Sequence, residues 1–238
     1  MRTDPEKVHH HWRMPDELWG RLQPLLPPRK PHPLGCHRPR VDDRNAMGAI
    51  FCVLRTGCQW NALKETGLCS SSSAHRRFQE WTAAGVFLAL WTSSLMAYEA
   101  LKGIDWEWLA MDGVMTKAPL GGEKVGKNPT DCGKLGTKRS VLTDGGVPIG
   151  LAVEGANRND FQMARAPLAS IPIARPEPTP DSPQGMCLDK GYDFDEVPDL
   201  LAEFGFTAHI RARGEEAKAL KQDAGYKVRR WVVERTHS

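Results

Sequence analysis

The sequence predicts a helical domain followed by an α/β domain. Apolar residues recur at helical spacing up to Gly103, and after it short apolar runs alternate with glycine-rich turns and helical stretches. The order strand, hairpin, helix, strand, helix, strand after Gly103 is typical of a sheet with both faces covered. We therefore expect a disordered tail over residues 1–13, a helical domain over 14–103 and an α/β domain over 104–238.

Composition places the chain among ordinary globular proteins. Of its 238 residues, 40% are hydrophobic and 26% charged, and the formal net charge is +3, so nucleic-acid binding would have to come from clustered cations. Its six cysteines are dispersed without a CxxC pair, which argues against a zinc ribbon and predicts reduced thiols. The amino terminus is polar and no apolar run has the length of a membrane span, so we expect a cytoplasmic protein.

The helical domain is expected to start with a helix that begins at Pro15 and ends at Pro27 and Pro28. A proline-rich basic arm follows, and its cations suit a phosphate backbone or a minor groove. A solvated linker would have the same composition, so the two interpretations remain equally open. The predicted DNA contacts in the arm are Arg29, Lys30, Arg38 and Arg40.

Two further helices are expected at the centre of this domain. The first begins at Asp42 and stops at Gly57. Its apolar face is formed by Met47, Ile50, Phe51 and Leu54. The second follows a serine-rich cap and begins with exposed cations, which is compatible with a helix-turn-helix; a plain helical bundle with a charged face is the alternative. Another helix is expected over residues 87–101. The predicted DNA contacts in the second helix are His75, Arg76 and Arg77.

The α/β domain is expected to begin with a buried strand over residues 106–111, because these are nearly all apolar, with Asp112 at its far end. A Gly- and Lys-rich stretch over 120–140 is a near match to a phosphate-binding P-loop. Asn128 and Pro129 stand where that loop needs a hydroxyl side chain and a helix, so we exclude nucleotide binding. We expect a mobile basic loop instead, with cations that suit DNA phosphates: Lys134, Lys138 and Arg139.

The remaining elements of this domain follow from turn and helix signals. A hairpin is expected around the turn at residues 144–146, and a helix is expected to begin at Phe161. A strand over 185–188, a helix that stops at Gly205 and a last strand over 206–213 complete the predicted sheet domain.

Three acids are candidates for one catalytic site. Asp112 and Asp189 each follow a short apolar run, and Glu234 lies in a terminal segment rich in basic and aromatic residues. Carboxylates without a Cys or His cluster favour Mg²⁺ or Mn²⁺. Two such ions could activate a water and stabilise the leaving oxygen of a phosphodiester. For each single acid, a turn or capping role is the alternative.

Several ordered segments resemble bacterial insertion-sequence transposases of the DDE class, in particular the IS-five family. They are LRTGCQW, AMDGVMTKAP, the Gly- and Lys-rich stretch, LDKGYD and RRWVVERTHS, and the resemblance runs from about Pro15 to the last residue. It implies an RNase H-like core behind a helical DNA-binding domain, with two magnesium or manganese ions held by Asp112, Asp189 and Glu234. It also implies cleavage of double-stranded DNA at terminal inverted repeats, strand transfer into target DNA, and a homodimer in a synaptic complex at the bacterial nucleoid.

The residues around Glu234 match the Tyr, Arg and Lys signature of that family only in part. Arg230 stands four residues before Glu234, as the signature requires, and is a further predicted DNA contact. Lys227 occupies the tyrosine position, with Tyr226 beside it, and the signature lysine would be residue 241. We therefore expect a chain truncated at its carboxyl terminus. The alternatives are a truncated, inactive DNA-binding regulator of transposition and an RNase H-like nuclease without strand transfer.

Overall fold

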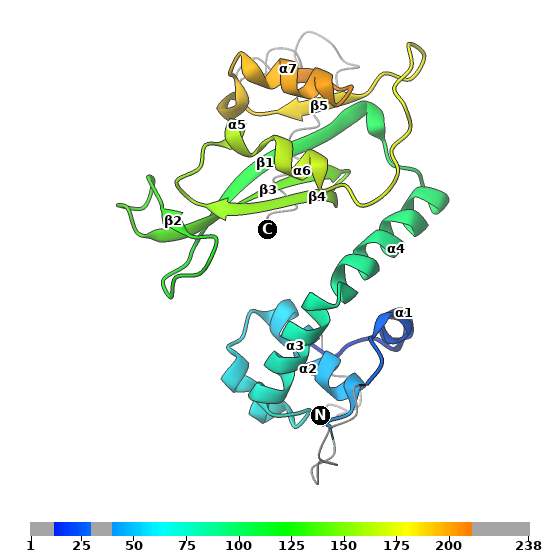
Figure 1. Cartoon of the computed structure of the whole chain (residues 1–238), viewed down its shortest axis with the longest axis vertical. Coiled ribbons are helices and arrows are strands. Elements are labelled where there is room, and N and C mark those ends of the chain that lie inside the picture. Colours follow the sequence, from blue (N-terminus) through cyan, green and yellow to red (C-terminus); the bar gives the residue numbers. More distant parts are fainter. Residues whose placement is uncertain (1–11, 30–39, 211–238) are drawn as a thin grey trace, which may run out of the picture. The chain divides into compact units, whose positions relative to one another are not determined.

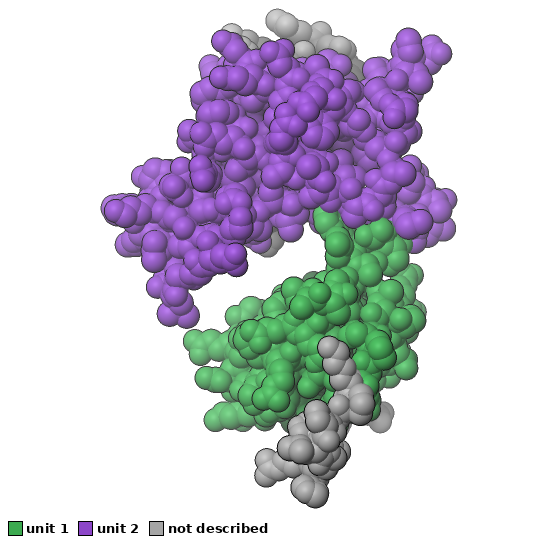
Figure 2. All heavy atoms as spheres, in the orientation of Figure 1, with its two compact units in different colours: residues 1–94 green, residues 95–238 purple. Residues whose placement is uncertain are grey.

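A computed structural model describes residues 12–29 and 40–210 of the chain (Figure 1). The chain divides into two compact units between Ser94 and Leu95, which Figure 2 shows in different colours. The domain boundary predicted after Gly103 stays a prediction. Outside the described residues lie most of the predicted tail and four of the predicted site residues, namely Lys30, Arg38, Arg230 and Glu234.

The first unit is built from helices, as the sequence predicts. Within the described ranges no single helix has the length and apolar character of a membrane span; only the last two helices taken together, across a 62° bend, pass that test. With η for a 3₁₀-helix, the elements are α1 (Asp16–Leu22), η2 (Gln23–Leu25), α2 (Asp43–Thr56), η3 (Trp60–Thr66), α3 (Ser71–Ala83) and α4 (Val86–Leu101), the last of which continues past Ser94 (Figure 1).

Local capping explains where α2 and α3 begin and end. The side chain of Asp42 accepts a hydrogen bond of 3.1 Å from the backbone N–H of Asn45, and Ser70 accepts one of 3.2 Å from Ser73. These bonds satisfy donors that the first turn of a helix leaves unpaired. Gly57 ends α2 in the left-handed conformation at φ +68°, which a residue with a side chain rarely adopts. The predicted start and stop of α2 are both confirmed.

Apolar contacts between α2 and α3 form the core of the first unit. Trp81 of α3 is fully buried and lies in one cluster with Met47 and Ile50 of α2. A second cluster gathers around the buried Leu63 of η3. Burying a side chain of this size contributes about 1.5–3 kcal/mol, so this packing determines the helix arrangement more than helix propensity does. Leu54 on the predicted apolar face is instead 61% exposed.

The second unit contains a six-stranded sheet. Strand β3 pairs antiparallel with β1 on one side and with β4 on the other, and the short β2 pairs with β3 beyond the end of β4. On the other side of β1, β5 and β6 run parallel to it. The strands are β1 (Leu109–Lys117), β2 (Gly126–Lys127), β3 (Leu135–Asp144), β4 (Val147–Gly155), β5 (Gly185–Leu188) and β6 (Thr207–Ile210).

The strand order β4–β3–β1–β5–β6, with three antiparallel strands followed by two parallel ones, is the RNase H-like arrangement. The predicted fold class is therefore confirmed: an RNase H-like α/β domain preceded by helices. The hairpin predicted at residues 144–146 joins β3 to β4, and both glycines of the turn have positive φ angles. Such angles suit the tight turn that a hairpin needs.

Among the described residues, helices cover one of the two faces of this sheet that the sequence predicts to be covered. A Cβ atom at Gly150 would lie 2.4 Å from the carbonyl oxygen of Pro167, so the backbone of α6 packs directly on β4. Successive side chains of a strand point to opposite faces, and on the other face Leu151 and Val153 remain 42% and 36% exposed. The helical elements of this unit are η4 (Trp106–Trp108), α5 (Asp160–Met163), α6 (Arg165–Ala169), η5 (Lys190–Tyr192) and α7 (Glu196–Glu203) (Figure 1).

Two sequence predictions for this unit are wrong in their boundaries. Residues 106–108 form a 3₁₀-helix, and β1 begins at Leu109 and continues to Lys117, so Asp112 lies inside the strand. The second half of β1, residues 113–117, is a strand because β3 pairs with it along its length. In the same way, residues 135–140 of the predicted basic loop belong to β3, because β1 and β4 supply hydrogen bonds on both sides.

Candidate catalytic site

Strands β1 and β5 bring Asp112 and Asp189 to neighbouring positions. The two strands are parallel, with Leu109 opposite Met186 and Ala110 opposite Cys187. Continuing this register by two residues places Asp112 opposite Asp189. Neighbouring strands lie about 4.8 Å apart, so carboxylates at such positions are within reach of one common ligand. Both residues are half-buried.

Each of these two carboxylates accepts a local backbone hydrogen bond. The Oδ1 atom of Asp112 accepts from the N–H of Gly113 at 2.8 Å, and that of Asp189 accepts from Gly191 at 2.8 Å. Asp189 is also the first residue before η5, so it does act as a helix cap, which was the alternative role for such an acid. The two bonds fix the orientation of the carboxylates.

A buried phenol lies close to both acids. Tyr192 of η5 is fully buried, and its hydroxyl is 3.5 Å from that of Ser140 on β3. Burial raises the pKa of the Tyr192 phenol, and the negative charges of Asp160, Asp112 and Asp189 raise it further. Asp160, at the start of α5, is thus a third acid of this region. The sequence pattern does not single out Asp160, because an acid in the first turn of a helix is common for its favourable interaction with the helix dipole.

The predicted basic residues of the second unit fall into different environments. Lys138 on β3 is buried, and its Nζ atom donates to Asp160 at 3.0 Å. Arg139 is exposed and lies on the Asp112 face of the sheet, because it stands opposite Val114, two residues from Asp112. Lys134 is exposed and donates to Asp131 at 3.2 Å. The hydrogen bond from Lys134 lowers the pKa of the Asp131 carboxyl.

The predicted basic residues of the first unit are partly engaged in ion pairs. Arg40 contacts both Asp43 and Glu80 at 3.2 Å, and each of these acids has a second arginine partner. His75 and Arg76 are exposed on α3, and the His75 ring meets the ring of Trp60 edge-on at 5.2 Å. The second partners are Arg29 for Asp43 and Arg77 for Glu80.

The described residues contain two of the three predicted metal ligands. Among the described ranges, no group of three or more His, Cys, Asp or Glu side chains is arranged to hold a metal ion. The predicted third ligand, Glu234, lies outside them. Paired carboxylate oxygens on adjacent strands are the donor type that Mg²⁺ and Mn²⁺ prefer, so the residues present fit part of such a site.

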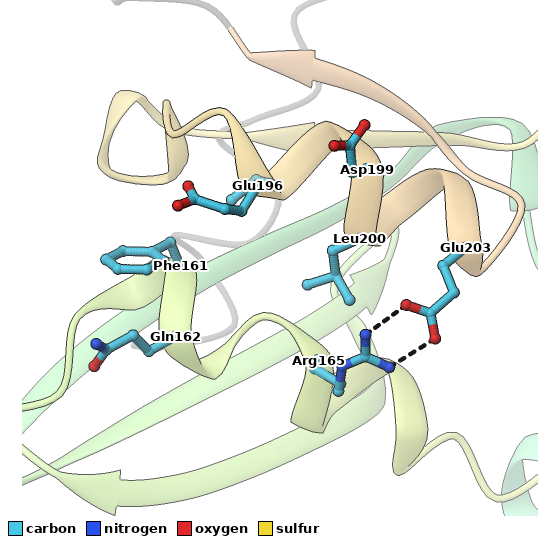
Figure 3. Close-up of a pocket in the computed structure, with 8 residues that line it drawn as sticks. Phe161, Gln162, Arg165, Glu196, Asp199, Leu200 and Glu203 are labelled. Atoms are coloured by element: carbon cyan, nitrogen blue, oxygen red, sulfur yellow. Dashed lines mark hydrogen bonds and ion pairs between the residues drawn. The ribbon is translucent and has the colours of Figure 1, made fainter.

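A groove between α5, α6 and α7 is a separate feature of the second unit (Figure 3). Phe161 and Leu200 contribute apolar surface, and the guanidinium of Arg165 donates to both carboxylate oxygens of Glu203, at 2.9 and 2.5 Å. That arginine lowers the pKa of the Glu203 carboxyl. Neither predicted catalytic aspartate lines this groove, so its chemistry is unrelated to them.

Comparisons with known proteins identify relatives of this chain. Residues 14–91 match the family model described as "Putative transposase of IS4/5 family (DUF4096)". The chain is 38% identical over 116 residues to the "Insertion element IS402 uncharacterized 16.2 kDa protein" of Burkholderia cepacia, an alignment that covers 48% of this chain and 79% of that protein. It is 34% identical over 122 residues to the "Putative transposase for insertion sequence element IS402" of the same organism, covering 50% of this chain and 55% of that protein.

Solved structures give a weaker match. The catalytic domain of Mos1 mariner transposase aligns at 12% identity with a TM-score of 0.32, covering 58% of this chain and 70% of that chain. The Mos1 paired-end complex with the left transposon end aligns at 12% identity with a TM-score of 0.30, covering 88% and 78%. The fold assignment therefore rests on the strand order and directions described above.

Proposed function

We propose a DNA-cleaving function on the premise that this chain belongs to the IS4/5 family of transposases. The proposed reaction is metal-dependent cleavage at the terminal inverted repeats of an insertion sequence, followed by strand transfer into target DNA. One observation supports the proposal, namely the register of β1 and β5, which would set Asp112 opposite Asp189 when it is continued two residues past the last pair of strand residues, Ala110 and Cys187. Paired acids on adjacent strands are costly to place so close unless a cation lies between them.

In this proposal, Asp112, Asp189 and Glu234 are the catalytic, metal-binding acids. Two Mg²⁺ or Mn²⁺ ions held by them would supply Lewis acidity at the scissile phosphate and lower the pKa of a bound water. The chain itself contributes orientation. The N–H groups of Gly113 and Gly191 each donate to one aspartate at 2.8 Å, which holds both carboxylates in a fixed orientation.

DNA backbone binding is assigned first to the exposed cations. Arg139 lies on the Asp112 face, where it would hold a phosphate next to the reacting bond. On α3, His75 and Arg76 are exposed and would contact the terminal repeat. Other predicted DNA contacts would exchange an ion pair with Asp43, Glu80 or Asp131 for a phosphate; these are Arg29, Arg40, Arg77 and Lys134.

A homodimer remains part of the proposal, because the proposed reaction acts on two ends of one element. Each subunit of a dimer would hold one of these ends in its active site. Predicted DNA contacts outside the described residues, Lys30, Arg38 and Arg230, are included on the strength of their charge alone.

Cleavage of a labelled duplex that carries the element's own end tests this function. The full chain is incubated with Mg²⁺ or Mn²⁺, beside Asp112→Asn, Asp189→Asn and the control Asp199→Asn. Asp199 is an exposed acid of α7, so the control removes the same charge away from the site. We expect cutting at the repeat end by the wild type and the control, and loss of at least about a thousandfold in the two site variants.

Two further outcomes separate the alternatives. Cut ends that never become joined to a second, unlabelled duplex would indicate a nuclease without strand transfer. Specific binding of the repeat without any cutting would indicate a regulator of transposition, and would contradict the catalytic proposal.

A further inference from the structure

An ion pair between a buried lysine, Lys138, and a half-buried aspartate, Asp160, lies directly behind the predicted catalytic strand. The side chain of Lys138 is 8% exposed, and its Nζ atom lies 3.0 Å from Oδ2 of Asp160, whose side chain is 28% exposed. A buried ammonium is costly unless a partner compensates its charge. At 8% exposure Lys138 has little surface to offer a DNA phosphate, although the sequence predicts such a contact.

The Asp160 carboxylate occupies the space that a side chain at Gly113 would fill. A Cβ atom on Gly113 would lie 2.2 Å from Oδ1 of Asp160 and 3.7 Å from Cδ of Lys138. The φ angle of Gly113 is not in the left-handed region, so space, and not backbone conformation, is what requires a glycine here. Asp112 and Gly113 point to opposite faces of β1, and the ion pair therefore supports the back of the strand that presents Asp112.

The same layer extends to the segment that carries Asp189. Ser140 stands opposite Gly113 in the ladder and is fully buried. Its hydroxyl is 3.5 Å from that of Tyr192, three residues after Asp189. Polar side chains on this face of the sheet thus lie against both segments that carry the two acids: Asp160 against Gly113 of β1, and Ser140 against Tyr192 of η5.

We propose that Lys138 and Asp160 form a positioning pair, which holds β1 through Gly113 and so sets the position of Asp112 against Asp189. The expected effect on metal binding rests on the proposed function. The support of β1 by the ion pair does not depend on that function. Neither residue touches substrate in this proposal. Lys138 is thereby assigned a positioning role in place of a phosphate contact.

The structural part is tested by hydrogen exchange of the Gly113 amide in the full chain. That N–H donates to Asp112 at 2.8 Å, so it reports the local geometry whether or not the protein binds metal or DNA. In Lys138→Met and in Asp160→Asn we expect exchange at least about tenfold faster than in the wild type, because each leaves one buried partner uncompensated. Unchanged exchange in both variants would overturn the proposal.

The functional part is tested by calorimetric titration of the same variants with Mn²⁺. A positioning role predicts that both single variants weaken Mn²⁺ binding about tenfold or more, as second-layer changes around metal ligands do. The double variant, which removes both charges together, should recover much of that loss. A charge effect without positioning predicts opposite signs, tighter binding in Lys138→Met and weaker in Asp160→Asn, and that result would overturn the proposal.

DNA binding separates the positioning role from the phosphate contact. Arg139 is the matched control, since it is the next residue, carries the same charge and is exposed. We expect Arg139→Met to reduce the slope of log affinity against log salt by about 0.9, and Lys138→Met to leave it unchanged. A reduced slope in Lys138→Met would show that Lys138 contacts a DNA phosphate, and it would overturn the proposed positioning role. Failure of the wild type to bind Mn²⁺ would contradict the proposed function. Hydrogen exchange of the Gly113 amide would still test whether the ion pair supports β1.

Discussion

Replacing Gly113 with alanine is expected to destabilise the sheet unit. The added Cβ atom would lie 2.2 Å from Oδ1 of Asp160 and 3.3 Å from its Cγ, whereas ordinary contacts begin near 3.4 Å. The carboxylate would therefore have to retreat by roughly 1 Å, against its 3.0 Å bond to the buried Lys138. Overpacking of this kind costs about 1–3 kcal/mol, and the lower chain entropy of alanine offsets about 0.5–1 kcal/mol, so we expect a net loss of about 1–2 kcal/mol.

Urea denaturation of the full chain, followed by circular dichroism, measures this loss. Gly20→Ala is the matched control, because nothing lies within 4 Å of the added atom, and in a helix alanine should gain about 0.5–1 kcal/mol. In a background of Asp160→Ala the Gly113 change should no longer destabilise and should gain up to about 0.5–1 kcal/mol from lower chain entropy, since the clashing carboxylate is gone. Equal destabilisation in both backgrounds, or no destabilisation in either, would refute the assignment of that space to Asp160.

Three further predictions concern single residues. Asp42→Ala should cost about 1 kcal/mol of unfolding free energy in urea denaturation, because it removes the cap of α2. The pKa of Tyr192 is raised in the folded state, so its contribution to stability is complete below roughly pH 10 and is lost above it. Tyr192→Phe should therefore flatten the fall in stability between roughly pH 10 and 12. Burial raises the pKa of Cys52 while Cys132 is exposed, so iodoacetamide should modify Cys132 about tenfold faster, as peptide mass spectrometry would show.

Features of the fold that depend on local chemistry could be predicted from the sequence. Asp42 and Gly57 mark the two ends of α2 because a cap and a left-handed stop act within one helical turn. The turn at residues 144–146 defines the hairpin for the same reason. The pairing of β1 with β5 could be expected only from the family resemblance, since the register joins residues nearly eighty positions apart.

Features that depend on tertiary packing could not be predicted. Lys138 and Asp160 look like a loop cation and a capping acid in the sequence, and their pairing appears only when β3 and α5 come together. The same holds for Arg40, which the sequence presents as a DNA contact and which the fold places between Asp43 and Glu80. The predicted end of strand β1 came too early in the sequence. A pattern of apolar residues cannot reveal that β3 supplies a pairing partner for β1 as far as Lys117.

Iron-directed cleavage of the polypeptide tests most directly whether Asp112 and Asp189 hold one metal site. Fe²⁺ that replaces Mg²⁺ produces hydroxyl radicals with ascorbate and peroxide, and these cut the chain next to the metal. A shared metal site predicts cuts near both Asp112 and Asp189, which excess Mg²⁺ suppresses together and which are absent in Asp112→Asn. Cuts at only one of the two segments, or a pattern that survives Asp112→Asn, would contradict a shared site.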